Sequence, residues 1–441
     1  MSALTEGART VYRGILGLTF LTLGTSAFAL ATPISDVFGL YQNAKTGTYL
    51  LLFLNNSEIR PGGGFIGSFA KVRFENGALK DLVVETNIYK RDNAFIADND
   101  IEPPEPLRRV NHAGRWALHD ANWYPDFSDS AQHVKWFYDR TSTEKETING
   151  VIGVTLTAAE ELMKLTGPVT VVEHNLTLTH DNFFREIQYR VEKGYFATEE
   201  NKNINEPKTV IRDLIPPLAQ KLKEVNPVAL TSYVAHMARE KQIVFWFSDT
   251  PSQARVEKWN WGGRIPTDPR PLFGTVNAAL DQAKSTRSIR QHTDITETTA
   301  GALRWTDVRI TRTHKGSYTW PDGDDANYLE LIVPSDAKID SVLVDGEDIL
   351  KNPNVLETNP QGFPIIQKVT SSVRYGQKLI GFWADTAVGE STVIELSYTT
   401  AASAHSQTRI IKQIGATNES VRLIRDDRVI FDGTLEADFE R

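Results

Sequence analysis

The strongest constraint on the fold is a continuous apolar run that is followed at once by a polar, glycine-rich loop. The run extends from Tyr49 to Leu54, and a second apolar run extends from Phe65 to Phe74. An unbroken apolar run is typical of a strand that is covered on both faces. A plain hairpin needs about two to five turn residues, and the connection here is longer and highly polar. We therefore predict a buried first strand that ends in a functional loop.

The loop combines amides, a carboxylate, a guanidinium and three glycines. These positions are Asn55, Asn56, Glu58, Arg60, Gly62, Gly63 and Gly64. Glycines let the backbone approach a phosphate, and successive amides form anion-binding concavities. Arg60 is suited to hold two oxygens of a ligand, while Glu58 either binds a metal or orients Arg60. The alternative is that these side chains only satisfy the loop's own backbone. The spacing is neither that of a Walker loop nor GxGxxG.

A second polar cluster lies in "LHDANWYPDF" and contains Asp120, Asn122 and Asp126. Two carboxylates and an amide suit Mg²⁺, so Glu58, Asp120 and Asp126 are the candidate metal ligands. The alternative is that Asp126 caps a helix beginning near Ser128, while Asn122 closes a turn. His119 is not expected to pair with Asp120, because neighbours on an extended chain point apart.

Lys208 is the third candidate. It follows Pro207 in the expected first turn of a helix, where the positive end of the helix would favour phosphate. A solvated lysine is the alternative at this position.

Composition excludes several classes of protein. The 441-residue chain has a net charge of −8, which argues against a generally basic nucleic-acid binder. It has no cysteine, which excludes disulfides, thiolate zinc sites and thiol catalysis.

The amino terminus carries an uncharged apolar run from Gly14 to Thr32, preceded by Arg9 and Arg13. The run is about as long as a membrane-spanning helix, and the preceding arginines predict an inside amino terminus. Residues 1–39 are therefore predicted to be a transmembrane anchor or signal segment with its linker. A cleaved signal and a buried core helix are the alternatives. The main prediction is a single-pass protein of the cell membrane whose bulk is extracytoplasmic.

The rest of the chain divides by pattern. Residues 40–295 mix strands and helices and are predicted to form an α/β domain with a mixed sheet flanked by helices. Within it, 151–172 reads as strand–helix–strand with parallel strands, with Thr157 and Glu160 as a capping box and Gly167 as the helix stop. Pro216 and Pro217 should kink or break a later helix. Residues 296–441 show short strands between turns and are predicted to form an all-β sandwich.

Four segments together resemble the bacterial family called domain of unknown function 4012. They are "YLLLFLNNSEIRPGGGFIGSF", "HDANWYPDF", "NGVIGVTLTAAEELMKLTGPVTV" and "TRIIKQIGA". Their order and spacing agree with the family from about Tyr49 to about Gly415. The family usually has an arginine where this chain has His119, and it typically carries a membrane-spanning segment before the domain. Its biochemical activity is not established, so the resemblance implies a place in the membrane and no reaction.

A more distant similarity is to the LytR–CpsA–Psr family, whose members transfer glycopolymers to the cell wall from lipid-linked pyrophosphate donors. On this similarity Glu58 and Arg60 fall near the pyrophosphate loop, and Lys208 stands where that family has arginines. Two functions follow as expectations. In the first, Arg60 and Asp120 are catalytic in phosphotransfer of a pyrophosphate-linked envelope glycopolymer, with Mg²⁺. In the second, the chain is a non-catalytic binder or scaffold of the bacterial cell envelope, with the membrane and a lipid-linked or wall glycopolymer as partners.

Overall fold

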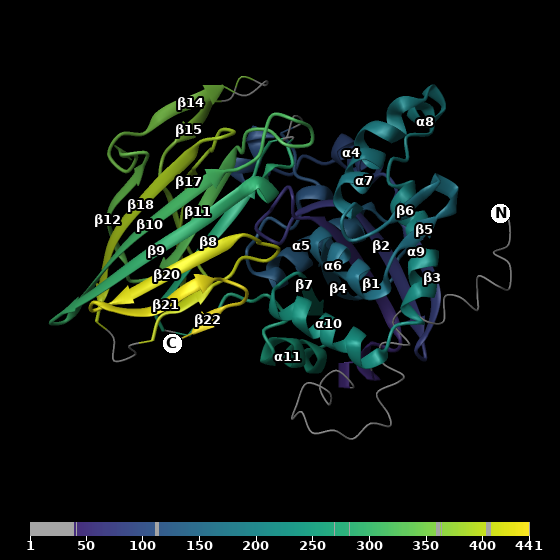
Figure 1. Ribbon diagram of the computed structural model, residues 1–441, viewed down its shortest axis with the longest axis horizontal. Helices are drawn as coiled ribbons and strands as arrows, with labels where there is room; N and C mark the ends of the chain where they lie inside the picture. The colour runs from purple at the N-terminus through teal and green to yellow at the C-terminus, as the bar shows by residue number, and fades with distance from the viewer. Residues whose placement is uncertain are drawn as a thin grey trace.

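The computed structural model describes residues 39–40, 42–110, 114–268, 270–281, 283–358, 362, 364–402 and 407–440. Within them it shows a mixed α/β part followed by a β-rich part, as the sequence predicts; the two lie side by side in Figure 1. No helix in these ranges is both long and apolar enough to span a bilayer. The predicted segment Gly14–Thr32 lies outside the described residues.

The α/β part is built on a five-stranded mixed sheet. Its strands, in spatial order, are β3 (Ala78–Val84), β2 (Phe65–Glu75), β1 (Gly47–Asn55), β4 (Ile148–Thr155) and β7 (Ile243–Phe247). The central strand β1 runs antiparallel to β2 and parallel to β4, so the loop after β1 and the start of the helix after β4 meet at one edge of the sheet.

Helices cover both faces of this sheet. The helices of the α/β part are α4 (Ile88–Asp98), α5 (Phe127–Thr141), α6 (Leu156–Thr166), α7 (Phe183–Tyr189), α8 (Glu199–Ile204), α9 (Thr209–Leu222), α10 (Pro227–Arg239) and α11 (Thr250–Lys258). On one face, Leu50, Leu52 and Leu54 pack against α4 and α5 in the largest apolar core. As predicted, α5 begins directly after Asp126, whose side chain accepts a hydrogen bond from the Ser128 amide.

The segment between β4 and β7 covers the other face. Here α6, α7 and α9 share an apolar core with a small hairpin of β5 (Val169–Val171) and β6 (Leu176–Leu178). The predicted parallel pairing of β4 with β5 is therefore wrong. Asn175, in the left-handed conformation, turns the short β5 straight into an antiparallel partner, and β1 takes the parallel place beside β4.

Two further details of this segment differ from prediction. Thr155, not Thr157, caps α6, since its hydroxyl accepts from the Ala158 amide; Gly167 ends the helix as predicted. The helix α9 continues through Pro216 and Pro217 without a break. Buried Leu214, Ala219 and Leu222 hold this helix in place on both sides of the prolines.

The β-rich part contains two large sheets that share one apolar core. The seven-stranded sheet has the order β13 (Glu347–Asp348), β12 (Lys338–Val344), β18 (Ser391–Ala401), β10 (Leu303–His314), β9 (Ile289–Ala300), β20 (Glu419–Arg425) and β21 (Arg428–Thr434). The six-stranded sheet has the order β16 (Thr370–Arg374), β17 (Gln377–Trp383), β11 (Asn327–Pro334), β8 (Leu272–Ala279), β19 (Arg409–Ile411) and β22 (Phe439–Glu440). A separate hairpin joins β14 (Asn354–Thr358) to β15 (Pro364–Gln367).

The sheets of the β-rich part begin at β8, so the boundary predicted at 295/296 is too late. The strand β8 reads "LFGTVNAA" and is buried at every position. Glycine, asparagine and alanine have low strand propensity, and burial on both faces removes the alternating pattern that marks other strands. The sequence of β8 therefore lacked the signal that placed the later strands.

Candidate functional site

Arg60 lies buried in the loop after β1, and most of its donors already have protein acceptors. Its Nε donates to Asp120 Oδ1 at 3.0 Å and its Nη2 to Glu58 Oε1 at 3.2 Å. Its Nη1 donates to the carbonyls of Ile59 and Ala279. Burial alone would lower the pKa of Arg60, but the adjacent Asp120 and Glu58 raise it overall. Arg60 is therefore a cation held by the fold, with little donor capacity left for a ligand.

His119 is a second cation beside it, and its side chain is partly buried. Its Nδ1 lies 2.7 Å from Asp92 Oδ2, and its Nε2 lies 3.2 Å from Asp120 Oδ2. The expectation that His119 and Asp120 point apart is wrong, because Leu118–Asp120 form a 3₁₀ turn and not an extended strand. Burial opposes the charge, yet Asp120 and Asp92 raise the pKa of His119 to about 10. The same contacts, with those of Arg60, lower the pKa of Asp120. A pKa in this range leaves His119 mostly protonated at neutral pH.

Glu58 is held from its other side by Lys284, which follows β8. Lys284 Nζ lies 2.6 Å from Glu58 Oε2 and 3.3 Å from Glu192 Oε1. Asp281, near the same end of β8, has a pKa raised to about 7 by burial and then by Asp325 and Glu58. Lys284 and Asp281 were not predicted from the sequence. Both follow the carboxyl end of β8, a strand of the β-rich part that the sequence did not reveal.

Lys208 differs from these cations. It is the residue before α9, and a Cβ added at Gly67 of β2 would lie 3.7 Å from its Nζ. Among the described residues, no acceptor forms a hydrogen bond or ion pair with the Lys208 amino group. Burial lowers the pKa of Lys208 to about 8, and Lys284 lowers it further while Glu192 and Glu58 oppose the shift. Lys208 is therefore a partly buried amine with unused donor capacity.

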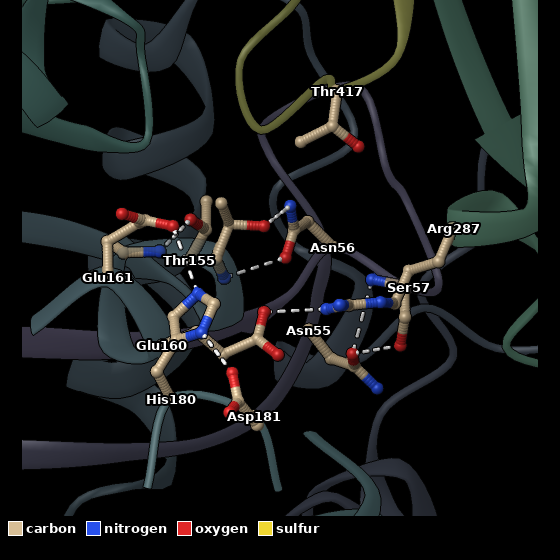
Figure 2. A network of polar contacts seen from close by, with 12 residues as sticks. Asn55, Asn56, Ser57, Thr155, Glu160, Glu161, His180, Asp181, Arg287 and Thr417 are labelled. Atoms are coloured by element: carbon tan, nitrogen blue, oxygen red, sulfur yellow. Dashed lines mark hydrogen bonds and ion pairs between the residues drawn. The ribbon is translucent and has the colours of Figure 1, made fainter. Parts of the chain in front are cut away.

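The amides of the predicted loop fix the backbone. Asn56 Nδ2 donates to Thr157 Oγ1 and to the carbonyl of Gly415, and Asn56 Oδ1 accepts from the Thr157 amide. Asn55 Oδ1 accepts from the Ser57 hydroxyl at 2.5 Å. Figure 2 shows these asparagines at the start of α6, near the ion pair of Glu160 with Arg287. The structural alternative to ligand binding thus accounts for Asn56.

Asn122 and the glycines also serve packing. Asn122 Nδ2 donates to the Gly64 carbonyl, and the Gly62 amide donates to the Asn122 carbonyl. A Cβ at Gly64 would lie 2.6 Å from the Asn55 carbonyl carbon, and its φ is +151°. Gly63 faces Gly415 of the β-rich part, where a Cβ would lie 2.2 Å from the Gly63 carbonyl oxygen. The three glycines therefore permit close backbone contacts.

The three predicted metal ligands do not come together. The carboxylates of Glu58 and Asp120 are paired with Lys284, Arg60 and His119. Asp126 lies at the start of α5, where it accepts from Arg264 Nε and from the Ile265 amide. No group of three or more potential protein ligands for a metal occurs in the part of the chain that the structure describes. The residues present therefore do not fit the predicted Mg²⁺ site.

A cavity of about 1330 Å³ joins the polar groups to an apolar interior. Glu58, Arg60, Asp120 and Lys208 line it at one end, together with Asn55. Apolar side chains of the sheet and its covering helices line the remainder. They include Leu51, Phe53, Ile152, Phe245, Ile211 and Leu218. The four polar side chains were separate candidates from the sequence, which did not predict the apolar space behind them.

The size of this cavity has a consequence for its contents. At about 24 cal/mol per Å³, a dry void of 1330 Å³ would cost about 30 kcal/mol. Whole domains are stable by only about 5–15 kcal/mol. The working protein must therefore fill the cavity with solvent or ligand, and an apolar lining favours an apolar ligand over water.

A family model described as "Protein of unknown function (DUF4012)" matches residues 45–191. This segment includes β1, the loop with Arg60, Asp120 and α6. The match supports the predicted resemblance over that third of the chain, and Lys208 lies beyond it. The comparisons do not show the similarity to the LytR–CpsA–Psr family. No curated protein matches the sequence.

Solved structures match only locally. A candidate nutrient-binding protein of Legionella pneumophila is 10% identical with a TM-score of 0.23, and the match covers 36% of this chain and 54% of that one. An M1 zinc metallopeptidase of Deinococcus radiodurans is 10% identical with a TM-score of 0.18, covering 31% of each chain. The leukotriene A4 hydrolase of Saccharomyces cerevisiae is 7% identical with a TM-score of 0.18, covering 32% and 24%. These TM-scores are too low to establish a shared overall fold.

Proposed function

We propose that the α/β part binds an amphiphile with a long apolar tail and an anionic headgroup. The main observation in support is the apolar cavity, which has Lys208 and the ion pairs around Glu58 at one end. In this arrangement the tail lies between the sheet and α6, α9 and α10, and the headgroup meets Lys208. A positive group at one end of an apolar site favours an acidic headgroup over a neutral one.

The lining also bears on the tail. The cavity is lined from Lys45, before β1, to Glu58, after it. The nine residues of β1 extend about 30 Å at 3.3 Å per residue. One leaflet of a bilayer provides about 15 Å of hydrocarbon, half of the usual core. A tail longer than that of an ordinary phospholipid therefore fits the space, as in a lipid that carries envelope glycopolymer precursors.

Binding without catalysis is favoured over transfer. Arg60 and Asp120, the two predicted catalytic residues, are bound to each other. His119 holds its proton between two carboxylates. Groups committed in this way stabilise the fold and have little freedom to take up or donate protons. On this proposal the chain carries or presents a membrane lipid at the extracytoplasmic surface, the location that the apolar segment Gly14–Thr32 predicts.

The second candidate is the expected phosphotransferase of pyrophosphate-linked glycopolymers. The observation in its favour is that Glu58, Arg60, Asp120 and Lys208 line one cavity. The full chain would be incubated with a polyprenyl-pyrophosphate-linked saccharide, an envelope acceptor and Mg²⁺, and released polyprenyl phosphate would be measured. Turnover that is lost in Asp120→Asn would favour the enzyme and displace the binding proposal.

The binding proposal is tested by the lipids that purify with the full chain. Ala159 of α6 lines the cavity, so Ala159→Trp would fill space that the tail occupies. Ala300→Trp, on the exposed end of β9, is the matched control. Mass spectrometry of extracted lipids is expected to find a long-chain acidic lipid on the wild type and Ala300→Trp, but not on Ala159→Trp. Equal lipid content in all three proteins, or none, would contradict the proposal.

A further inference from the structure

The charges at the polar end of the cavity are almost all paired with each other. Arg60 contacts Glu58 and Asp120, and His119 contacts Asp92 and Asp120. Lys284 contacts Glu58 and Glu192. Each of these three cations therefore already faces two carboxylates, and none has a surplus of positive charge to offer a ligand.

Lys208 is the exception among the described cations at this end. Its ammonium carries three donors, and no described residue accepts from them. The charged groups that act on it from the elements packed around it are Glu192, Lys284 and Glu58. A negatively charged ligand oxygen near Lys208 is thus attracted by one ammonium group and repelled by the carboxylates of Glu58 and Glu192. Among the described residues, the nearby Asp281 accepts hydrogen bonds only from backbone amides, those of Ala283 and Ala326, and it adds a further acidic group.

We propose that the site around Lys208 selects a headgroup with a single negative charge, such as a phosphodiester, and discriminates against a dianion. The inference rests on the proposed function and narrows its ligand class. One charge matches the one ammonium that lacks a protein partner. A second charge would lie among Glu58, Glu192 and Asp281 with no cation left to balance it, and uncompensated like charges in a buried site are strongly disfavoured. Lys208 is the specificity-determining residue on this view.

A matched pair of lipids tests the charge directly. Hexadecyl methyl phosphate carries one charge, whereas hexadecyl phosphate is mostly a dianion at pH 7.5 because the second pKa of a phosphomonoester is about 6. The two have the same tail and differ by one methyl group. Binding to the delipidated full chain, below the micelle concentration, is measured by calorimetry. We expect the diester to bind about tenfold or more tightly than the monoester. Hexadecanoate, a singly charged carboxylate, is expected to bind like the diester because both carry one charge, and a difference between the two affinities would distinguish a fatty acid from a phospholipid as the source.

Lysine variants assign the effect to its residue. Lys208→Met keeps the length and volume of the side chain and removes the charge. It is expected to reduce binding of the diester about tenfold or more while binding of hexadecanol stays unchanged. Lys45→Met is the matched control, since Lys45 lines the same cavity before β1 and its amino group contacts only Gln42 among the described residues. This control is expected to bind the diester like the wild type.

The outcomes separate the two proposals. If the diester and the monoester bind equally, or the monoester binds more tightly, the charge inference is overturned and the binding proposal stands. If Lys208→Met binds the diester as the wild type does, the headgroup does not lie at Lys208 and the inference also fails. If none of the long-chain lipids binds, the proposed function fails and the inference fails with it.

Discussion

Leu51 and Leu52 are neighbours on the central strand β1, and they face very different surroundings. Leu52 is completely buried in the core that α4 and α5 complete. Leu51 lies on the opposite face and lines the cavity, where it is only partly buried. Phe127 and Phe137 of α5 fill the space over the first face. The second face is covered by helices that rest on their own core with β5 and β6, so a space remains beneath them. An apolar strand can therefore border either a packed core or a cavity, and the elements that cover it decide which.

The largest expected effect is at the polar end of the cavity. Arg60→Met would leave Glu58 and Asp120 without their shared cation. Removing one partner of a buried ion pair typically costs about 3–5 kcal/mol, so we expect the free energy of unfolding to fall by that amount in urea denaturation. Arg73→Met, on the exposed part of β2, should change it by less than about 0.5 kcal/mol. A loss below about 1 kcal/mol at Arg60 would show that its charge serves a ligand rather than the fold.

The next test compares the two leucines directly. Leu52→Ala removes atoms from a filled core and should destabilise the protein by about 2–5 kcal/mol. Leu51→Ala removes atoms that already border a cavity, so we expect a cost of about 1 kcal/mol or less, mainly from lost transfer free energy. Both are measured by denaturant unfolding of lipid-free protein. Equal losses would mean that the second face is packed as tightly as the first.

A smaller effect is expected when volume is added instead of removed. Ala131 of α5 is fully buried against the packed face, so Ala131→Phe should overpack it and cost about 1–3 kcal/mol. Ala159 faces the cavity, and Ala159→Phe should change stability by less than about 1 kcal/mol. Thermal unfolding of the two variants without lipid would expose the difference. Similar losses would remove the distinction between the faces.

The smallest expected effect concerns pH. The folded pKa of Lys208 is lowered to about 8, whereas lysine in an unfolded chain titrates near 10.4. The unfolded chain therefore binds the proton more tightly, and Lys208 lowers stability below pH 8 while stability rises as the pH increases from about 8 to 10.4. This difference in pKa corresponds to about 3 kcal/mol, and solvent at the partly exposed Lys208 reduces it. Lys208→Met should therefore be about 1–2 kcal/mol more stable than the wild type at pH 7, and the gain should disappear near pH 10.5. A gain that does not vary with pH would mean that the amine is well solvated.

The sequence predicted local structure well where caps and periodicity were clear. Asp126 and Gly167 mark helix ends as expected. It failed where the partner of an element is decided by distant residues. Nothing in the sequence of β5 distinguishes a parallel neighbour of β4 from an antiparallel partner of β6.

The site shows the same division. Glu58, Arg60, Asp120 and Lys208 were each candidates from the sequence, and all four line one cavity. The sequence did not distinguish Arg60, which is paired, from Lys208, which has no acceptor among the described residues. The groups that decide this difference lie more than two hundred residues along the chain from the first loop: the Ala279 carbonyl accepts from Arg60, and Lys284 pairs with Glu58. Nor does an apolar stripe on a helix reveal whether protein or ligand covers it.

The contact of Gly63 with Gly415 has a consequence for dissecting the molecule. The first loop of the sheet closes only when the chain returns from β19, and Gln413 Nε2 then donates to the Arg60 carbonyl. A fragment that stops at the end of the α/β part would leave this loop without its contacts to Gln413 and Gly415 and would expose Asn56 to water. We therefore expect the two parts to fold as one unit and to require expression together. If β-rich parts were exchanged between relatives, the "IIKQIGA" segment would have to be transferred together with the loop glycines that it contacts.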